Sequence, residues 1–441
     1  MLTDSPRPLV FVRSIYLHPR DDSQMWGSCF DSPAEGAGFD GYSLGVMGWA
    51  LSRGPRAVSV EYSYAANLLG SAPVNIDRPD IATAFPDAEN ALKCGFHFSF
   101  STVKLPRNAD VFVRAILEDG THVSIGVITI ERQPVATNYQ PRFQPLIIST
   151  LGRTGSTWVA RVLGEHPQIA AYRPFEYEPR LASYWLEVLH TVAEPCSYYQ
   201  ALDGELYDNT WWLGTRRSTP APTRFLDDNI TRWFARDSVQ ATARFAMERI
   251  DSFYTEVAQM QGKRDAVFFA EKCWPGAFVP HSITELYSGA KEIILVRDFR
   301  DMVCSILSFN KKLGHASFGR ELAESDEQFV RQLRISAVRT LEHWRERGSA
   351  AHLLRYEDLI LHPHATLRGV LGYLGLDASD ATIEATLARA HGLTPHLQAG
   401  HRTTKDPAAS IGRWQHDLDD SLKAVCEDAF GDVLEQLGYD A

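Results

Sequence analysis

The clearest chemical pattern lies at residues 147–158, IISTLGRTGSTW, where an apolar stretch leads into a loop with two glycines and then into helix-forming residues. Glycine leaves backbone N–H groups open to an anion, and the N-terminus of the next helix adds the positive end of its dipole. Arg153, Ser156 and Thr157 add a cation and two hydroxyl groups. The pattern predicts a phosphate-binding loop. From the residues alone, a strand-to-helix turn capped by Ser156 and Thr157 is the alternative.

The loop does not follow the GxxxxGK[ST] pattern of nucleoside triphosphatases. No lysine follows Gly155, and the cation Arg153 comes before it. In that pattern the lysine reaches the β- and γ-phosphates, and the hydroxyl group binds Mg²⁺. The residue order therefore disfavours a nucleotide-dependent kinase of a small molecule, which stays the first alternative function.

A second basic site follows the apolar stretch 291–296. Arg297 comes directly after this stretch, and Ser305 follows eight positions later. Ligands of open α/β sheets bind beyond the carboxyl ends of the strands, so an arginine there and a hydroxyl group on the next helix can meet on one phosphate. Arg297 could equally pair with Asp298 or Asp301, and Ser305 could simply line a helix face.

Together these segments resemble the sulfotransferases that use 3′-phosphoadenylyl sulfate. Four motifs occur in that family's order: Arg153-Thr154-Gly155-Ser156-Thr157, Arg297-Asp298-Phe299-Arg300-Asp301 with Ser305, Arg355-Tyr356-Glu357-Asp358-Leu359, and Ser410-Ile411-Gly412-Arg413-Trp414. The resemblance implies a P-loop-like parallel sheet, 3′-phosphoadenylyl sulfate as co-substrate and no required metal. With its arginine, the first loop resembles the loops of bacterial and Golgi enzymes more than those of cytosolic enzymes, which carry a lysine. Without a membrane anchor in the sequence, we expect a bacterial enzyme.

The resemblance assigns the co-substrate to all four motifs. The first loop would hold the 5′-phosphosulfate, while Arg297 and Ser305, with Arg402 and Ser410 of the late loop, would hold the 3′-phosphate. Tyr356 would contact the adenine, although a core tyrosine at a strand end is equally compatible with the sequence. The residues expected to bind the co-substrate are Arg153, Thr154, Gly155, Ser156, Thr157, Trp158, Arg297, Ser305, Tyr356, Arg402, Ser410 and Gly412.

An acceptor hydroxyl group needs a base, and relatives with an arginine loop use a glutamate shortly after the first helix. Here Glu176 is the first choice and Glu178 the second, although both could be surface glutamates in a loop bounded by prolines. Lys272 resembles the lysine that contacts the transferring sulfuryl group, and Arg153 would stabilise the leaving oxygen. The cytosolic branch has a catalytic histidine where this chain has Trp274, so the role of base passes to a carboxylate.

The elements that must position these residues change in type along the chain. Residues 7–135 read as short alternating strands, most clearly at 111–130, where Asp119-Gly120 suits a two-residue hairpin turn. This pattern predicts a β-sandwich accessory domain. Three prolines between 132 and 145 mark a boundary, and from 143 to 441 strands alternate with helices, which is typical of a parallel sheet. The aromatic-rich, helix-prone stretch 181–263 is expected to be an acceptor-binding insertion. Ser325 and Gln328 form a capping box for a helix that Gly348 would end.

The composition limits the partners. The 441 residues carry 44 Lys and Arg against 55 Asp and Glu, a net charge of −11, which disfavours nucleic acid as a partner. The six cysteines show no metal-ligand spacing, so we expect no metal site. No apolar run approaches the roughly 18 to 20 residues of a membrane span, and we expect a cytoplasmic protein.

The sequence thus predicts an enzyme that transfers a sulfuryl group from 3′-phosphoadenylyl sulfate to a hydroxyl group of a carbohydrate or glycolipid. The step would be an in-line displacement with a glutamate base. A non-catalytic glycan-binding protein that retains a nucleotide fold is the second alternative. The presence of Arg153, Glu176 and Lys272 together disfavours it.

Overall fold

The computed structural model describes residues 8–19, 23–65, 67–194, 233–275, 278–392 and 407–439, so Arg402 lies outside the described residues. The chain forms two compact units. The first comprises Met1–Tyr139 and Leu186–Ala246, and the second comprises Gln140–Trp185 and Met247–Ala441. The second segment of the first unit falls within the expected insertion. The domain limits 7–135 and 143–441 stay a proposal.

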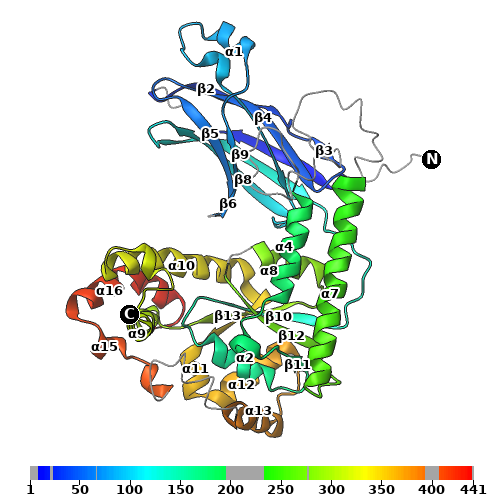
Figure 1. The fold of residues 1–441 in the computed structure, drawn as a ribbon, viewed down its shortest axis with the longest axis vertical. Helices are drawn as coiled ribbons and strands as arrows, with labels where there is room; N and C mark the ends of the chain where they lie inside the picture. Colours follow the sequence, from blue (N-terminus) through cyan, green and yellow to red (C-terminus); the bar gives the residue numbers. More distant parts are fainter. Residues whose placement is uncertain are drawn as a thin grey trace. The chain divides into compact units, whose positions relative to one another are not determined.

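The first unit contains two antiparallel sheets (Figure 1). The larger has the strand order β3-β1-β9-β8-β5-β6, and the smaller has the order β2-β4-β7. The strands are β1 Val10–Leu17, β2 Met25–Ser32, β3 Gly38–Phe39, β4 Ser43–Ser52, β5 Ala57–Tyr64, β6 Asn67–Pro73, β7 Gly95–Ser101, β8 Asn108–Leu117 and β9 His122–Arg132, and the short helix α1 is Pro79–Ala84. Tyr62 of the larger sheet stacks on Phe98 of the smaller one, with ring centroids 4.2 Å apart. The predicted all-β region is confirmed.

The hairpin between β8 and β9 forms where the sequence predicted it. Asn108 pairs with Glu131 at one end of the ladder, and Ile116 pairs with His122 at the other. Gly120 in the turn has a φ of 82°, a conformation that costs glycine little because it has no Cβ. Apolar side chains alternate along β8 toward the core, as the period-two pattern requires.

The second unit is built on a five-stranded parallel sheet of order β11-β12-β10-β13-β14. Its strands are β10 Gln144–Thr150, β11 Ile169–Ala170, β12 Phe268–Cys273, β13 Lys291–Val296 and β14 Ala351–Arg355. Every residue of β12 is buried, as expected for a parallel strand covered on both faces. The predicted parallel α/β sheet is confirmed. Its first strand, β10, lies in the middle, so its carboxyl end is flanked by those of β12 and β13.

Helices cover both faces of this sheet (Figure 1). Ile293 and Leu295 pack in a core with α2, α12 and α13, whereas Ile294 and Val296 pack in a second core with α9, α10 and α16. The helices are α2 Ser156–Gly164, α3 Pro174–Tyr177, α4 Leu181–Ala193, α7 Ser238–Met260, α8 Phe278–Leu286, α9 Phe299–Leu313, α10 Asp326–Arg347, α11 Tyr356–Leu361, α12 Pro363–Leu374, α13 Asp380–Gly392, α15 Trp414–Asp417 and α16 Asp420–Gln436. None of the helices in the described ranges is long and apolar enough to cross a membrane.

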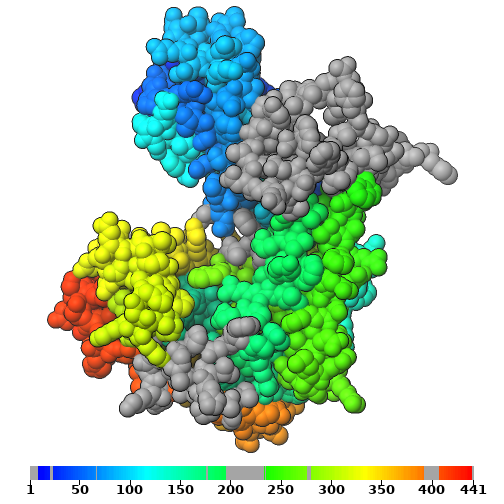
Figure 2. Space-filling model, in the orientation of Figure 1, coloured from blue at the N-terminus to red at the C-terminus, as the bar shows by residue number. Residues whose placement is uncertain are grey.

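Helix α10 shows how local sequence fixes an element of this unit. The Ser325 side chain accepts a hydrogen bond from the Gln328 amide at 3.1 Å, and the helix ends at Arg347 before Gly348. The Ser325 cap and the stop at Gly348 are therefore confirmed, whereas the Gln328 side chain accepts from the Glu324 amide instead of completing the capping box at Ser325. Helices α10 and α16 lie side by side at the surface (Figure 2), where Arg334 pairs with Asp432 at 2.7 Å.

Candidate active site

The predicted phosphate loop connects β10 to α2 through two residues with positive φ. Arg153 has a φ of 66° and Gly155 a φ of 85°. A Cβ on Gly155 would lie 2.3 Å from Cδ2 of Tyr356, so both the backbone conformation and the close approach require glycine. Gly155 is the N-cap of α2, and no side chain caps it. Because the N-cap residue has no side chain, the first amides of α2 are placed as in an anion-binding helix terminus.

Thr154 belongs to the inside of the loop. Its side chain is buried, and its hydroxyl group lies 2.5 Å from that of Thr150 and 2.9 Å from the carbonyl oxygen of Leu151. These bonds tie the loop to the end of β10. Thr154 thus shapes the loop from within.

Arg153 connects the first motif to the second. Its Nε donates to the Ser305 hydroxyl group at 3.2 Å, and its guanidinium lies 4.4 Å from the ring centroid of Phe309. Ser305 and Phe309 are both on α9, the helix that follows β13. Two residues predicted for different phosphates, Arg153 and Ser305, are therefore neighbours.

Arg297 is 5% exposed and sits at the carboxyl end of β13. It donates to the carbonyl oxygen of Arg153 at 3.2 Å and to that of Ser410 at 2.7 Å, and it lies over the ring of Tyr356. Its Nε is buried and has no hydrogen-bond partner among the described residues. A buried guanidinium with an open donor is a ready partner for an anion.

The two aspartates that could have paired with Arg297 have other partners. Asp298 accepts from Arg300 at 2.9 Å, and Asp301 accepts the backbone N–H groups of Gly412 at 2.7 Å and Trp414 at 3.0 Å. Burial raises the pKa of Asp301, and the two amides oppose that shift. Asp301 thereby fixes the late loop beside α9.

The third and fourth motifs also meet. The Tyr356 hydroxyl group, at the start of α11, lies 3.4 Å from the Ser410 hydroxyl group. The sequence was compatible with a core tyrosine at a strand end, but β14 ends at Arg355 and Tyr356 is the first residue of a helix. Its ring is buried between Gly155 and Arg297.

Lys272 lies on β12 and is 2% exposed. Its Nζ donates to the Thr157 hydroxyl group at 3.4 Å and forms an ion pair with the carboxylate of Glu178. The Glu178 side chain is 51% exposed. The Glu176 side chain lies outside the described residues, although its backbone belongs to α3.

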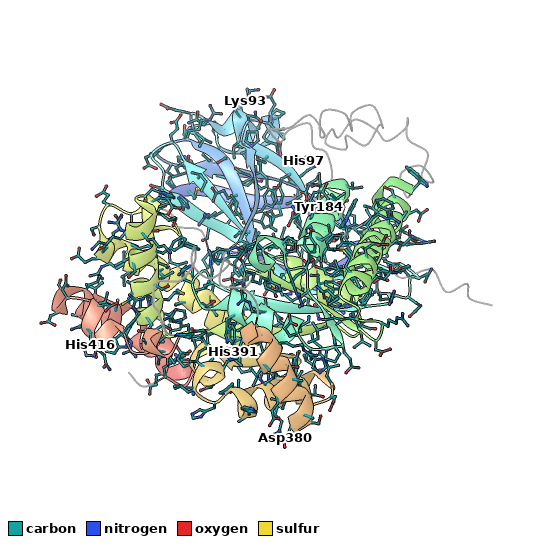
Figure 3. The ribbon with its side chains drawn as sticks, turned by 60° about the horizontal axis from the view of Figure 1, so that its bottom comes forward. Lys93, His97, Tyr184, Asp380, His391 and His416 are labelled. Atoms are coloured by element: carbon teal, nitrogen blue, oxygen red, sulfur yellow. The ribbon has the colours of Figure 1, made fainter. Side chains whose placement is uncertain are left out.

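Trp158 lies on α2 and packs against the hydrophobic core of the unit. Its ring centroid is 4.9 Å from that of His391, which is labelled at the end of α13 in Figure 3. Trp274, which follows β12, is 48% exposed.

Sequence reasoning missed Glu271, the neighbour of Lys272. This buried carboxylate accepts from the Tyr254 hydroxyl group at 2.5 Å and from the Ala182 amide at 2.9 Å. The available signal was an acidic residue within the apolar strand FFAEKC, because a buried carboxylate needs polar partners.

The described site is thus a cluster of cations at adjacent strand ends. Arg153 follows β10, Lys272 belongs to β12 and Arg297 follows β13. Together with the N-terminus of α2 they can hold an anionic ligand and stabilise negative charge that develops on it. Within the described ranges no group of three or more His, Cys, Asp and Glu side chains could hold a metal ion.

Comparison with known proteins gives a family and several similar folds. A family model described as "Sulfotransferase family" matches residues 145–380. Among solved structures, a sulfotransferase domain of the Synechococcus PCC 7002 olefin synthase is 20% identical, covers 70% of this chain and 100% of its own, and has a TM-score of 0.39. A sulfotransferase from Mycobacterium avium is 14% identical over 68% of this chain and 78% of its own, with a TM-score of 0.35. A mouse sulfotransferase complexed with PAP is 11% identical over 68% of this chain and 87% of its own, with a TM-score of 0.36. No curated protein matches the chain.

Proposed function

The chain belongs to the sulfotransferase family, and from this premise we propose that it transfers a sulfuryl group from 3′-phosphoadenylyl sulfate to an acceptor hydroxyl group. The observation that carries the proposal is the meeting of Arg153, Lys272 and Arg297 at three adjacent strand ends. These three cations lie together in a chain whose net charge is −11. A local positive site in an acidic protein favours binding of one small anion over binding of a polyanion.

Two features of the site fit the nucleotide part of this co-substrate. The glycine at 155 lets the Tyr356 ring pack directly against the phosphate loop, and the open Nε of Arg297 offers a buried donor. We assign the 5′-phosphosulfate to the loop, with Arg153, Ser156 and Thr157. We assign the 3′-phosphate to Arg297, Ser305 and three residues of the late loop, Arg402, Ser410 and Gly412. Tyr356 would contact the adenine.

The step needs a cation at the transferring group and a base at the acceptor. The acceptor oxygen bonds to sulfur while the bond from sulfur to the 5′-phosphate oxygen breaks, and the acceptor proton passes to a carboxylate. Lys272 would neutralise charge on the transferring group, and Arg153 would do so on the leaving oxygen. The ion pair with Lys272 supports Glu178 as a member of the site, and Glu176 remains the base chosen from the sequence.

For the acceptor we propose a hydroxyl group of a carbohydrate or glycolipid. The support is the arginine form of the loop, which resembles bacterial and Golgi enzymes. The antiparallel unit would then be an accessory module, and the 181–263 stretch would contribute to acceptor binding. A cytoplasmic, bacterial setting belongs to the same proposal.

Calorimetry with adenosine 3′,5′-bisphosphate tests the nucleotide site. We expect tight binding in the absence of metal ions, and a preference for Mg-ATP would overturn the assignment in favour of a kinase. Transfer from labelled donor into polysaccharide and glycolipid acceptors, followed by mass spectrometry, tests the reaction. Loss of label from the donor without transfer to any hydroxyl acceptor would contradict the proposed acceptor class.

The base is tested by a matched pair of variants. Glu176→Gln should lower kcat by about 100-fold or more, because the carboxylate is lost while the shape stays the same. Affinity for adenosine 3′,5′-bisphosphate should remain within about two-fold in both Glu176→Gln and Glu178→Gln. If Glu178→Gln loses turnover and Glu176→Gln retains it, Glu178 is the base and the first choice was wrong.

A further inference from the structure

Glu271 is a buried carboxylate with defined partners next to the candidate active site. It is 3% exposed, and its side chain holds the N-terminus of α4. The Ala182 amide lies 2.9 Å from Oε1 and 3.1 Å from Oε2, and the Tyr254 hydroxyl group donates to Oε1 at 2.5 Å. A carboxylate at a helix N-terminus complements both the free amides and the dipole.

Glu271 and Lys272 are consecutive residues of β12, so their side chains leave opposite faces of the sheet. Lys272 reaches Thr157 on α2 and Glu178, whereas Glu271 reaches α4 and α7. One strand therefore holds the same short segment of chain through two neighbouring residues.

That segment runs from Tyr177 to Ala182. At its start Tyr177 is buried in the core beside α2, with a φ of 63°. At its end the first turn of α4 is held by Glu271. Glu178 lies between these two anchors and pairs with Lys272. Loss of either anchor would release the Glu178 carboxylate from a defined position.

We propose that Glu271 is a positioning residue for sulfuryl transfer, because its carboxylate fixes the first turn of α4 and thereby holds Glu178 against Lys272. The proposal rests on the proposed function and adds to it. Neither Glu271 nor Tyr254 touches the candidate phosphate-binding residues in the contacts described above.

The hydrogen bonds that Glu271 accepts from Tyr254 and from α4 depend on the protonation state of its carboxylate. Burial raises its pKa to about 7, while the Tyr254 hydroxyl group and the α4 amides act in the opposite direction. A proton on one oxygen would remove an acceptor that the Ala182 amide or Tyr254 uses. The titratable or charged groups that act on Glu271, on its partner Tyr254 or on the nearby Cys273 are Tyr254 on α7, Tyr287 after α8, Arg180 before α4 and Glu292 on β13.

The test compares Glu271→Gln with Glu292→Gln in the full chain. Glu292 is a matched control, since it is a buried carboxylate on β13 that accepts from Ser149 at 2.5 Å and His343 at 2.6 Å. We expect Glu271→Gln to lower kcat by about 10- to 100-fold, because Glu178 and its partner Lys272 would be slightly misplaced, and a small misplacement of a catalytic group has effects of that size. Its affinity for adenosine 3′,5′-bisphosphate should stay within about two-fold of wild type.

Two readouts separate positioning from general damage. The step near pH 7 in the wild-type kcat profile should be absent in Glu271→Gln and present in Glu292→Gln. The amides of Glu178 and of residues 180–183 should exchange hydrogen faster in Glu271→Gln alone. A variant with wild-type kcat, or with unchanged exchange at these amides, overturns the proposal.

Tyr254→Phe covers the case in which Glu271→Gln does not fold. It removes one donor, at 2.5 Å from Oε1, and leaves the amides in place. We expect a smaller fall in kcat and a shift of the pH step, and an unchanged profile would overturn the proposal. If the wild type binds no adenosine 3′,5′-bisphosphate and transfers no sulfate, the proposed function fails, whereas the exchange result still decides whether Glu271 fixes α4.

Discussion

Strand β7 of the antiparallel unit and strand β12 of the parallel sheet are buried at every residue, and β13 is buried after Lys291, but the side chains that they bury differ in charge. Along β7 the rings of Phe96, Phe98 and Phe100 pack in a row. The parallel strands bury Glu271 and Lys272 on β12, and Arg297 directly after β13. Among the described residues, the parallel-sheet unit buries carboxylates and lysines, whereas the basic side chains buried in the antiparallel unit are His97, Arg132 and His190.

This difference in buried side chains follows from where the strands end in the two kinds of sheet. Parallel strands place all their carboxyl ends at one edge, where helix N-termini also start, so polar side chains there can be satisfied by amides and by one another. Hairpins place strand ends at both edges and fill the space between the sheets with apolar side chains. We therefore expect substitutions in the antiparallel unit to lower stability, and substitutions at the carboxyl ends of the parallel strands to lower the affinity for the ligand.

The largest expected effect comes from two buried arginines, one in each unit. Arg132 donates to the carbonyl oxygen of Leu105 at 2.5 Å, and Arg297 donates to that of Ser410 at 2.7 Å. Arg297→Ala should weaken binding of adenosine 3′,5′-bisphosphate by about 100-fold, or about 3 kcal/mol, because a buried charged donor is lost. Calorimetry measures this loss.

Arg132→Ala is the matched control for that measurement. It should lower the melting temperature, because the carbonyl group of Leu105 loses its donor, and it should leave the affinity for the nucleotide within about two-fold. Equal losses of affinity in both variants would break the proposed division between the units.

A smaller effect is expected from two glycines with similar backbone angles. Gly155 has a φ of 85° and Gly120 a φ of 82°, but an added Cβ meets the Tyr356 ring only at 155, and nothing lies within 4 Å at 120. Gly120→Ala should cost about 1 kcal/mol of unfolding free energy for the left-handed backbone alone. Gly155→Ala should cost about 2 kcal/mol more, because the buried ring must move.

Urea unfolding of both glycine variants measures these costs. Nucleotide affinity should fall only in Gly155→Ala. If the two substitutions cost the same, the close approach of Tyr356 to the loop is not a constraint on the fold.

The sequence was enough to predict the elements whose signals are local. The alternation along 111–117 with Asp119-Gly120 predicted the β8–β9 hairpin, and Ser325 with Gln328 predicted the start of α10. The loop at 147–158 was predictable because glycine, cation and hydroxyl groups stand together in sequence.

Other features depend on contacts between distant parts of the chain, which no local pattern encodes. The strand order places β10 between β12 and β13 although more than a hundred residues separate β10 from β12. The anchoring of α4 by Glu271 joins residues 89 positions apart. The 23-residue helix α7 arises within a stretch where the sequence indicated only helix-prone residues.

The smallest expected effect is a difference in how stability depends on pH. Burial raises the pKa of Glu271 from 4.5 to about 7 in the parallel-sheet unit, and it lowers the pKa of His97 from 6.5 to about 4 in the antiparallel unit. Between pH 4.5 and 7 the folded state holds more protons on Glu271 than the unfolded state does, so its contribution to stability falls as the pH rises. Between pH 4 and 6.5 the folded state holds fewer protons on His97, so its contribution rises.

Each slope is at most about 1.4 kcal/mol per pH unit for one proton, and the two oppose each other where their windows overlap. Glu271→Gln should therefore make the unfolding free energy rise more steeply with pH between 5 and 6.5, whereas His97→Gln should make it rise less steeply. Urea titrations at several pH values measure both slopes. If the two variants change the slope in the same direction, burial does not shift the pKa values of Glu271 and His97 in the opposite directions predicted for the two units.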